Sequence, residues 1–243
     1  FINVGLMHQS IVTFASGGNF GGSDGTIVKF EDGQILDDPI TIYDKDVTID
    51  SWSDFFDEKD LVFDNCKVII NGKHNFRSLQ LINGTKLTHD NVNENNPFGF
   101  EICIETILFI DEHSEITSDG KGYSGGSKLY NAKTLGFEEG AIGASGGSYG
   151  GLGGRIDGSS GFSYGNIESP VYAGSGGGNS TEIESSTGGF GGGSVKIEAN
   201  VVNLLGVLSS NGTDGVNGGG GGSGGSVFIK ANQIEGMGLI EAN

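Results

Sequence analysis

The chain has 243 residues, of which 47 are glycine and 3 are proline, and its formal net charge is −18 at pH 7. Clumped glycine with so little proline excludes a collagen helix, which needs glycine at every third position. The strong negative charge makes nucleic acids and anionic membrane surfaces unsuitable partners. No apolar run approaches the roughly 20 residues that span a bilayer, so we expect a soluble protein without membrane insertion.

The first half of the chain predicts short strands separated by tight turns. Its β-branched or alternating runs are followed by turn pairs such as Asn71-Gly72 and Asn83-Gly84. No window shows the 3.6-residue apolar period of a helix, so helix should be almost absent. The clearest expected strands lie at 41–43, 66–70, 79–82 and 102–110.

An internal repeat near the C-terminus is the most informative feature. Residues 194–211 return 32 positions later as residues 226–243, with seven of eighteen positions identical, and a more diverged copy covers 102–120. A unit of two or three short strands cannot bury its apolar side chains alone and must stack on its neighbours. We therefore predict an all-β chain that forms a right-handed parallel β-helix, or β-solenoid. Its expected core side chains in the repeat are Val195, Ile197, Leu208, Val227, Ile229 and Ile240.

Glycine is concentrated in one region, since 35 of the 47 glycines lie between residues 118 and 225. Such runs are common in flexible linkers, but aromatic residues interrupt this one at intervals. Aromatic rings pack well on bare backbone, so we expect ordered glycine-rich loop excursions on one side of the solenoid. Residues 1–61 should form an acidic, strand-rich segment or cap that continues into the solenoid of residues 62–243.

Several phrases, read together, resemble a known class of protein. They are Leu79–His89, Gly143–Gly154, Tyr164-Gly165-Asn166 with Pro170, Gly174–Gly178, Gly193–Ile197 and Gly225–Ile229. In this order they are similar to the glycine-rich parallel β-helix modules of very large secreted or cell-surface, adhesin-like proteins of bacteria and unicellular eukaryotes. The resemblance covers roughly residues 62–243, and residues 1–61 match no such phrase.

The resemblance implies a secreted or cell-surface protein of structural or adhesive type, with no catalytic residues to transfer. We therefore expect a non-enzymatic segment that assembles end to end into a fibre or filament. Its expected partners are copies of itself or further repeats of the same chain, with surface glycans as an additional partner. The alternative is a carbohydrate-active or carbohydrate-binding β-helix protein that acts on polysaccharide.

Candidate catalytic groups are sparse. A glycoside hydrolase needs two carboxylates at a suitable separation, and the nearest candidate pairs are Glu101 with Glu105 and Asp111 with Glu112. Arg77 and Arg155 are the only arginines, so a site for acidic sugars would have few guanidinium groups to bind the sugar carboxylates. The histidines at 8, 74, 89 and 113 show no metal-binding spacing. The glycine runs do not lead from a strand into a helix, as a nucleotide site requires.

An acidic stretch from Asp37 to Asp64 raises the question of calcium, which needs six to eight oxygen ligands. Asp44, Asp46 and Asp50 are the candidate ligands, although their spacing matches no known calcium loop and a solvated acidic edge is favoured. No other cofactor is expected.

Two modifications remain open. Cys66 and Cys103 allow one disulfide. Asn83, Asn179 and Asn211 begin N-glycosylation sequons at expected turns, as many sequons as this composition gives by chance.

Overall fold

The protein is built from β-strands in the part that the computed structural model describes, residues 11–13, 27–29, 39–94, 96–97 and 99–243. Helix is limited there to one 3-10 turn, Leu135–Phe137. The first sheet contains β3 (Ile40–Tyr43), β5 (Asp60–Asp64), β7 (Gly72–Phe76), β8 (Ser78–Ile82), β10 (Phe100–Ile110), β12 (Ser194–Leu204) and β14 (Ser226–Glu235). The second sheet contains β4 (Asp46–Ile49), β6 (Lys67–Ile70), β9 (Lys86–Thr88), β11 (Glu115–Thr117), β13 (Val207–Ser209) and β15 (Leu239–Glu241). Two further strands, β1 (Ile11–Thr13) and β2 (Ile27–Lys29), pair antiparallel with each other.

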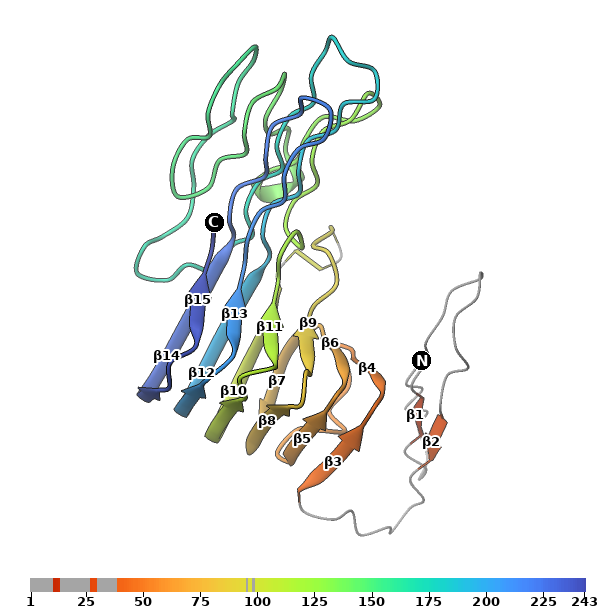
Figure 1. The fold of residues 1–243 in the computed structure, drawn as a ribbon, viewed down its shortest axis with the longest axis vertical. Coiled ribbons are helices and arrows are strands. Elements are labelled where there is room, and N and C mark those ends of the chain that lie inside the picture. The colour runs from red at the N-terminus through yellow and green to blue at the C-terminus, as the bar shows by residue number, and fades with distance from the viewer. Residues whose placement is uncertain (1–10, 14–26, 30–38, 95, 98) are drawn as a thin grey trace.

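From β3 to β15 the chain alternates between the two sheets, except that β7 and β8 follow each other in the first sheet. Every pairing within the two sheets is parallel. Each strand pair that follows in sequence, such as β12 with β13 or β14 with β15, forms one layer, and successive layers lie side by side (Figure 1). The 32-residue repeat sets the register of the last two layers, because Val195 pairs with Val227 and Val207 pairs with Leu239.

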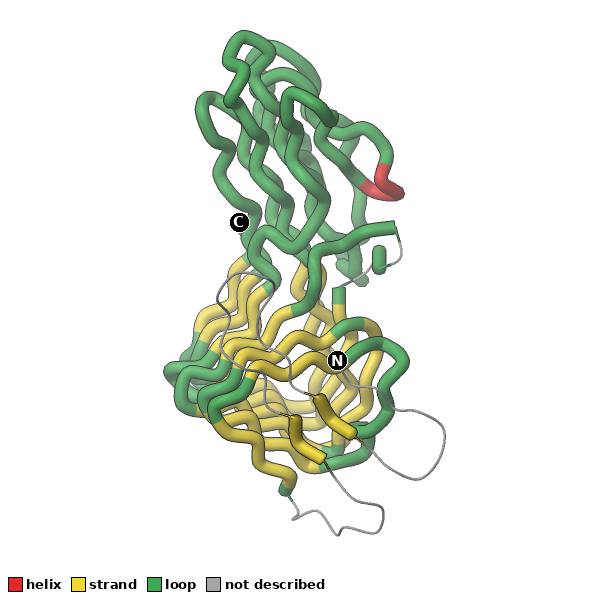
Figure 2. The backbone as a smooth tube through the Cα atoms, turned by 90° about the vertical axis from the view of Figure 1, so that its right-hand side faces the viewer, coloured by secondary structure: helices red, strands yellow, loops and turns green. Residues whose placement is uncertain are grey.

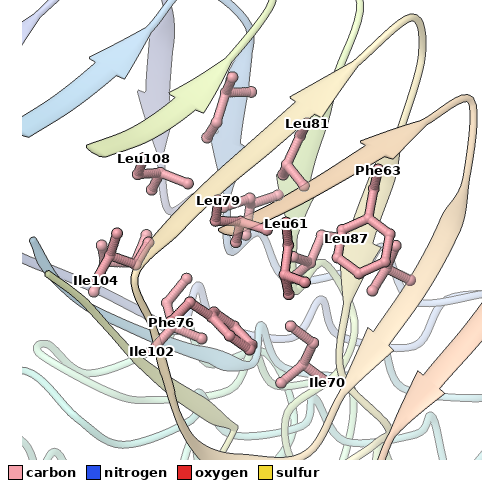
Figure 3. Packing of buried hydrophobic residues seen from close by; sticks show 14 of the residues in the cluster. Leu61, Phe63, Ile70, Phe76, Leu79, Leu81, Leu87, Ile102, Ile104 and Leu108 are labelled. Carbon is pink, nitrogen blue, oxygen red and sulfur yellow. The ribbon is translucent and has the colours of Figure 1, made fainter. Parts of the chain in front are cut away.

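One hydrophobic core lies between the two sheets, and Figure 3 shows a part of it with labelled side chains from β5 to β10. Its side chains form columns that follow the strand register. In the second sheet, Val47, Val68, Leu87, Ile116, Leu208 and Ile240 occupy one column. In the first sheet, the equivalent column is Ile40, Leu61, Leu79, Leu108, Val202 and Ile234. Each layer therefore covers the apolar side chains of the layer before it.

The corner between the sheets is built from stacked polar residues in the first three layers. Asp44, Asn65 and Asn83 all have positive φ, between 51° and 55°, a conformation that asparagine and aspartate tolerate better than most residues. Asn65 Nδ2 donates to Asp44 Oδ1 at 2.6 Å, and Asn83 Nδ2 donates to Asp64 Oδ1 at 2.9 Å. These side chains join one layer to the next outside the apolar core.

A glycine-rich lobe stands on one side of the layers and consists of two excursions, residues 118–193 between β11 and β12 and residues 210–225 between β13 and β14 (Figures 1 and 2). Its segments are extended and hydrogen-bonded, yet the lobe holds no strand among the described residues. Gly188 and Gly191 donate to Gly126 and Tyr123, whereas Gly189 and Gly192 donate to Gly220 and Ser223. Residues three positions apart in this segment therefore donate hydrogen bonds to the same neighbouring segment. A period of three residues is that of a polyproline II helix.

Glycine is required in this lobe because backbones approach each other closely. A Cβ at Gly188 would overlap the carbonyl oxygen of Gly177, and one at Gly220 would overlap that of Ser145. Aromatic residues pack into the lobe unequally. Tyr123 is buried against Phe137 with ring centroids 5.1 Å apart, whereas Tyr130, Phe162 and Phe190 are exposed. The backbone segments of the lobe are thus closely packed, but only part of the aromatic set packs inside it.

The β-rich fold with parallel sheets and almost no helix is confirmed. The strands β3 and β4 belong to the same sheets as the later strands, and the boundary at residue 61 lies inside β5. One expectation, about the core, needs correction. Val195, Ile197 and Leu208 are fully buried, but Val227 and Ile229 are only partly buried and Ile240 is exposed. The last two strands have neighbours on one side only, so their core-facing side chains stay partly uncovered.

Candidate functional site

An open groove of about 790 Å³ lies on the outer face of the first sheet. It crosses the corner between β7 and β8 and then the middle of β10, β12 and β14. Its lining residues include Asn75, Arg77, Cys103, Glu105, Glu198, Asn200, Lys230 and Asn232.

The groove lies where the long strands bend. The first half of β10 pairs with β7 and its second half with β8, so Arg77, between β7 and β8, faces the middle of β10. The register of β10 against β12 shifts between Ile104 and Ile107, which marks a β-bulge at Glu105 and Thr106. Glu105 is exposed there.

Amide side chains line part of the groove in register. Asn232 Nδ2 donates to Asn200 Oδ1 at 2.9 Å, and the two residues stand 32 positions apart in the repeat. Neighbouring strands are about 4.8 Å apart, so these amides present donors and acceptors at that interval. Such a row can hydrogen-bond an extended polar chain that lies across the strands.

A row of alternating charges runs beside the amides across the same face. We call Lys73, Glu101, Lys196, Glu198 and Lys230 the charge row. Lys73 Nζ lies 2.8 Å from Glu101 Oε1, and Lys196 Nζ lies 3.2 Å from both Glu101 Oε2 and Glu198 Oε1. The hydrogen bond from Lys73 lowers the pKa of Glu101, against an opposing effect of burial, and Lys196 adds to the lowering. Every charge of the row is engaged in an ion pair within it, so this face favours an uncharged polar ligand over an ionic one.

A buried histidine lies where the lobe meets the layers. His89 Nδ1 lies 2.6 Å from the Asp90 carbonyl oxygen, which can only accept, so Nδ1 carries the proton. Nε2 has no hydrogen-bond partner among the described residues and faces Gly193, where a Cβ would overlap it. Burial lowers the pKa of His89 to about 4. The ring is therefore neutral and fills the space that a side chain at residue 193 would need.

The acidic residues of the first layers serve the fold. Asp44 accepts from Asn65, Asp57 Oδ1 lies 3.2 Å from His74 Nδ1, and Asp60 binds Arg77 and Ser78. No group of three potential metal ligands is present in the described part of the chain, and Asp44, Asp46 and Asp50 form no such cluster. Asp37 and Asp38 lie outside the described residues.

The structure does not join Cys66 to Cys103, and both thiols are free. The Cys66 Sγ donates to the carbonyl of Ile42 at 3.3 Å inside the corner between the sheets, whereas Cys103 lines the outer groove. A disulfide between them is therefore not part of this fold.

Asn83 lies in a bend, whereas Asn179 and Asn211 lie in irregular segments, and the side-chain amide of each donates a hydrogen bond. Asn83 is exposed, and Asn179 and Asn211 are half-buried. Asn179 Nδ2 lies 3.3 Å from the Ser180 carbonyl, and Asn211 Nδ2 donates to Glu241 Oε1 at 2.8 Å. N-glycosylation leaves one N–H on the amide nitrogen, so at Asn211, whose Nδ2 donates to both Asp119 and Glu241, it would remove one of the two hydrogen bonds.

The candidate carboxylate pairs have different surroundings. Glu101 belongs to the charge row, whereas Glu105 stands in the groove at the bulge. Asp111 accepts from the Asn83 and His113 backbone amides and thereby shapes a turn, and Glu112 pairs with His113 at 3.6 Å on the surface. His74 is buried against Phe76, Arg155 is exposed, and His8 lies outside the described residues.

The groove residues Asn200, Asn232 and Lys230 did not stand out in the sequence. The signal that could have found them is the repeat itself. Identical polar residues at the same repeat position, as at 200 and 232, must stack in a parallel sheet, and opposite charges at 198 and 230 must pair.

No protein-family model, curated protein or solved structure matches this chain. In the part of the chain that the structure describes, no helix is both long and apolar enough to cross a bilayer.

Proposed function

We propose that the chain is a non-enzymatic, extracellular structural or adhesive module whose layers form a right-handed parallel β-helix, or β-solenoid. The support is that the strands from β3 to β15, apart from the consecutive pair β7 and β8, alternate between two parallel sheets around one core. A right-handed path follows the strong preference of parallel crossover connections. The extracellular setting rests on the resemblance of its glycine-rich phrases to surface proteins.

The observation that carries the structural role is the uncovered face of the layer formed by β14 and β15. Ile234 and Ile240 continue two buried columns but are 54% and 47% exposed. Both strands also leave backbone groups unpaired on their outer edge, which is a template for further pairing. This face fits another layer of the same repeat, supplied by a copy of this protein or by further repeats of the same chain.

Sedimentation velocity over a range of concentrations tests this role. The wild-type chain should form larger species as concentration rises, and the variant Ile234→Lys/Ile240→Lys should stay monomeric because charges would face the uncovered columns. The variant Leu129→Ser/Tyr130→Ser, changed in the lobe, is the matched control and should associate as the wild type does. A wild type that is monomeric at every concentration contradicts assembly through this face.

The groove supports a second candidate function, the binding of an uncharged polysaccharide. Its amides at Asn75, Asn200 and Asn232 and the exposed Glu105 can hydrogen-bond hydroxyl groups. No exposed aromatic residue lines it, so binding would depend on polar contacts. Titration calorimetry with cello- and chito-oligosaccharides should give binding to the wild type and none to Asn200→Ala/Asn232→Ala. Equal binding heats for the wild type and the variant would show that the groove does not bind these oligosaccharides.

A further inference from the structure

Three turns at the end of the glycine-rich lobe farthest from the sheets expose large apolar side chains. The turns are residues 127–130, 180–187 and 214–219 (Figure 1). Leu129 is 77% exposed, Tyr130 71%, Val216 54% and Ile183 45%. Isolated exposed apolar residues are common, but a group of them on one feature marks an interaction site.

Contacts between the turns hold the three segments next to one another. Lys128 forms an ion pair with Glu184, which joins the first turn to the second. Thr187 and Val216 exchange backbone hydrogen bonds of 3.1 and 2.8 Å, and Asn217 Nδ2 donates to the Ser185 carbonyl at 3.1 Å. These bonds join the second turn to the third. We call Leu129, Tyr130, Ile183 and Val216 the tip patch.

The backbone beneath the tip patch is held in place. Ser127 and Tyr130 exchange backbone hydrogen bonds, and Ser186 N donates to the Ile183 carbonyl at 2.9 Å. Asn217 and Gly218 both have positive φ, as a tight turn requires. A preformed surface loses little conformational entropy when a partner binds. The exposure of these side chains is thus fixed by the fold.

The charges of the three turns indicate what kind of partner fits. They contain one basic residue, Lys128, and three acidic residues, Glu182, Glu184 and Asp214. Lys128 is engaged by Glu184, and neither Glu182 nor Asp214 takes part in an ion pair within the described chain. The whole chain also carries a net charge of −18. An anionic lipid surface would be repelled, and a basic surface would be attracted.

We propose that the tip patch is a docking surface for a protein partner whose own surface combines apolar and basic side chains. The proposal deepens the adhesive role and rests on it. The aromatic ring of Tyr130 and the side chain of Leu129 supply apolar contact area at the centre of the interface. The carboxylates of Glu182 and Asp214 supply pairing partners at its rim.

An immobilised amphipathic peptide of lysine and leucine is the probe, and surface plasmon resonance near 0.15 M salt is the measurement. The wild-type chain should bind this peptide at least tenfold more tightly than its glutamate and leucine counterpart. The variant Leu129→Ser/Tyr130→Ser should lose at least tenfold in affinity for the lysine peptide. These side chains are exposed, so circular dichroism and the melting temperature should not change.

The control variant is Ile156→Ser/Ile167→Ser, which removes two side chains that are 81% and 97% exposed in other parts of the surface. It should bind the lysine peptide as the wild type does. Equal losses in the two variants, or equal binding of both peptides, would overturn the proposal. So would stronger binding to phosphatidylcholine vesicles than to the lysine peptide, because the partner would then be a lipid surface. Self-association through the last layer is unaffected by either variant, so failure of the tip patch is distinguishable from failure of the structural role.

Discussion

Leu208 and Ile240 are Cα partners in adjacent parallel strands, yet Leu208 is fully buried and Ile240 is 47% exposed. The two residues occupy the same position in consecutive repeats. Their different burial has one cause: β13 has a strand on each side, and β15 has a neighbour only on one. Burial in this fold therefore depends on the next layer as well as on the residue.

Truncation of the two residues should separate these effects. Leu208→Ala should lower the free energy of unfolding by about 2–5 kcal/mol, because it leaves a cavity in a closed core. Ile240→Ala should cost less than half as much, since part of that side chain already contacts water. Chemical denaturation of both variants under non-associating conditions measures the difference. Equal losses would show that the register of β13 and β15 is wrong.

Glycine in the lobe should be replaceable only where the backbone has room. Gly188→Ala should destabilise the lobe, because the new Cβ would overlap the Gly177 carbonyl. Gly151→Ala is the control, since no atom of another residue lies within 4 Å of its Cβ position, and it should be neutral or slightly stabilising. Hydrogen exchange of the lobe amides measures both effects. Unchanged protection in Gly188→Ala would contradict the close backbone packing.

His89 should make the stability depend on pH between about 6.5 and 4. Its folded pKa of about 4 lies below the ordinary 6.5, so the unfolded chain binds the proton more readily. The stability from neutral His89 is therefore complete above pH 6.5 and is lost as pH falls towards 4, by roughly 3 kcal/mol in all. The charged neighbours act in opposite directions, since Lys121 lowers this pKa and Asp90 raises it.

The variant His89→Phe isolates this effect, because its ring cannot take up a proton. The slope of unfolding free energy against pH in this window should become shallower in His89→Phe and stay unchanged in His113→Gln, whose side chain is exposed. An identical slope in His89→Phe and the wild type would show that His89 does not titrate as a buried group.

The corner residue Asn65 should tolerate glycine better than alanine. Its φ of 52° is accessible to glycine without strain and costs other residues about 1–2 kcal/mol. Both substitutions remove the hydrogen bond to Asp44, so this loss cancels in the comparison. In thermal unfolding, the melting temperature of Asn65→Ala should therefore be lower than that of Asn65→Gly. The reverse order would mean that the side-chain size, and not the backbone, determines this position.

The sequence predicted the fold best where the repeat is least diverged. Identity between Val195 and Val227, and between Ile197 and Ile229, was enough to predict that β12 and β14 stack in register. It could not predict the short strands β4 and β9, because three or four residues carry too little periodicity. The exposure of Ile240 was missed because it depends on what covers the layer.

The candidate sites were less predictable than the strands. Stacking places Asn200 beside Asn232 and Glu101 between Lys73 and Lys196, but residues 101 and 196 are too far apart in the chain for spacing to pair them. The tip patch was missed for the same reason, since the turns that carry Leu129, Ile183 and Val216 lie next to one another only when two excursions fold together. The disulfide between Cys66 and Cys103 was an expectation from composition alone. In the structure, Cys66 lies in the corner between the sheets and Cys103 lines the groove on the outer face, so the two thiols are separated.

Negative-stain electron microscopy of the wild type and of Ile234→Lys/Ile240→Lys tests the proposed structural role most directly. If the layer of β14 and β15 accepts another layer of the same repeat, wild-type particles should lengthen into rods or fibres as concentration rises, and the variant should remain as short single particles. Short, monodisperse wild-type particles at every concentration, with and without calcium, would contradict the account.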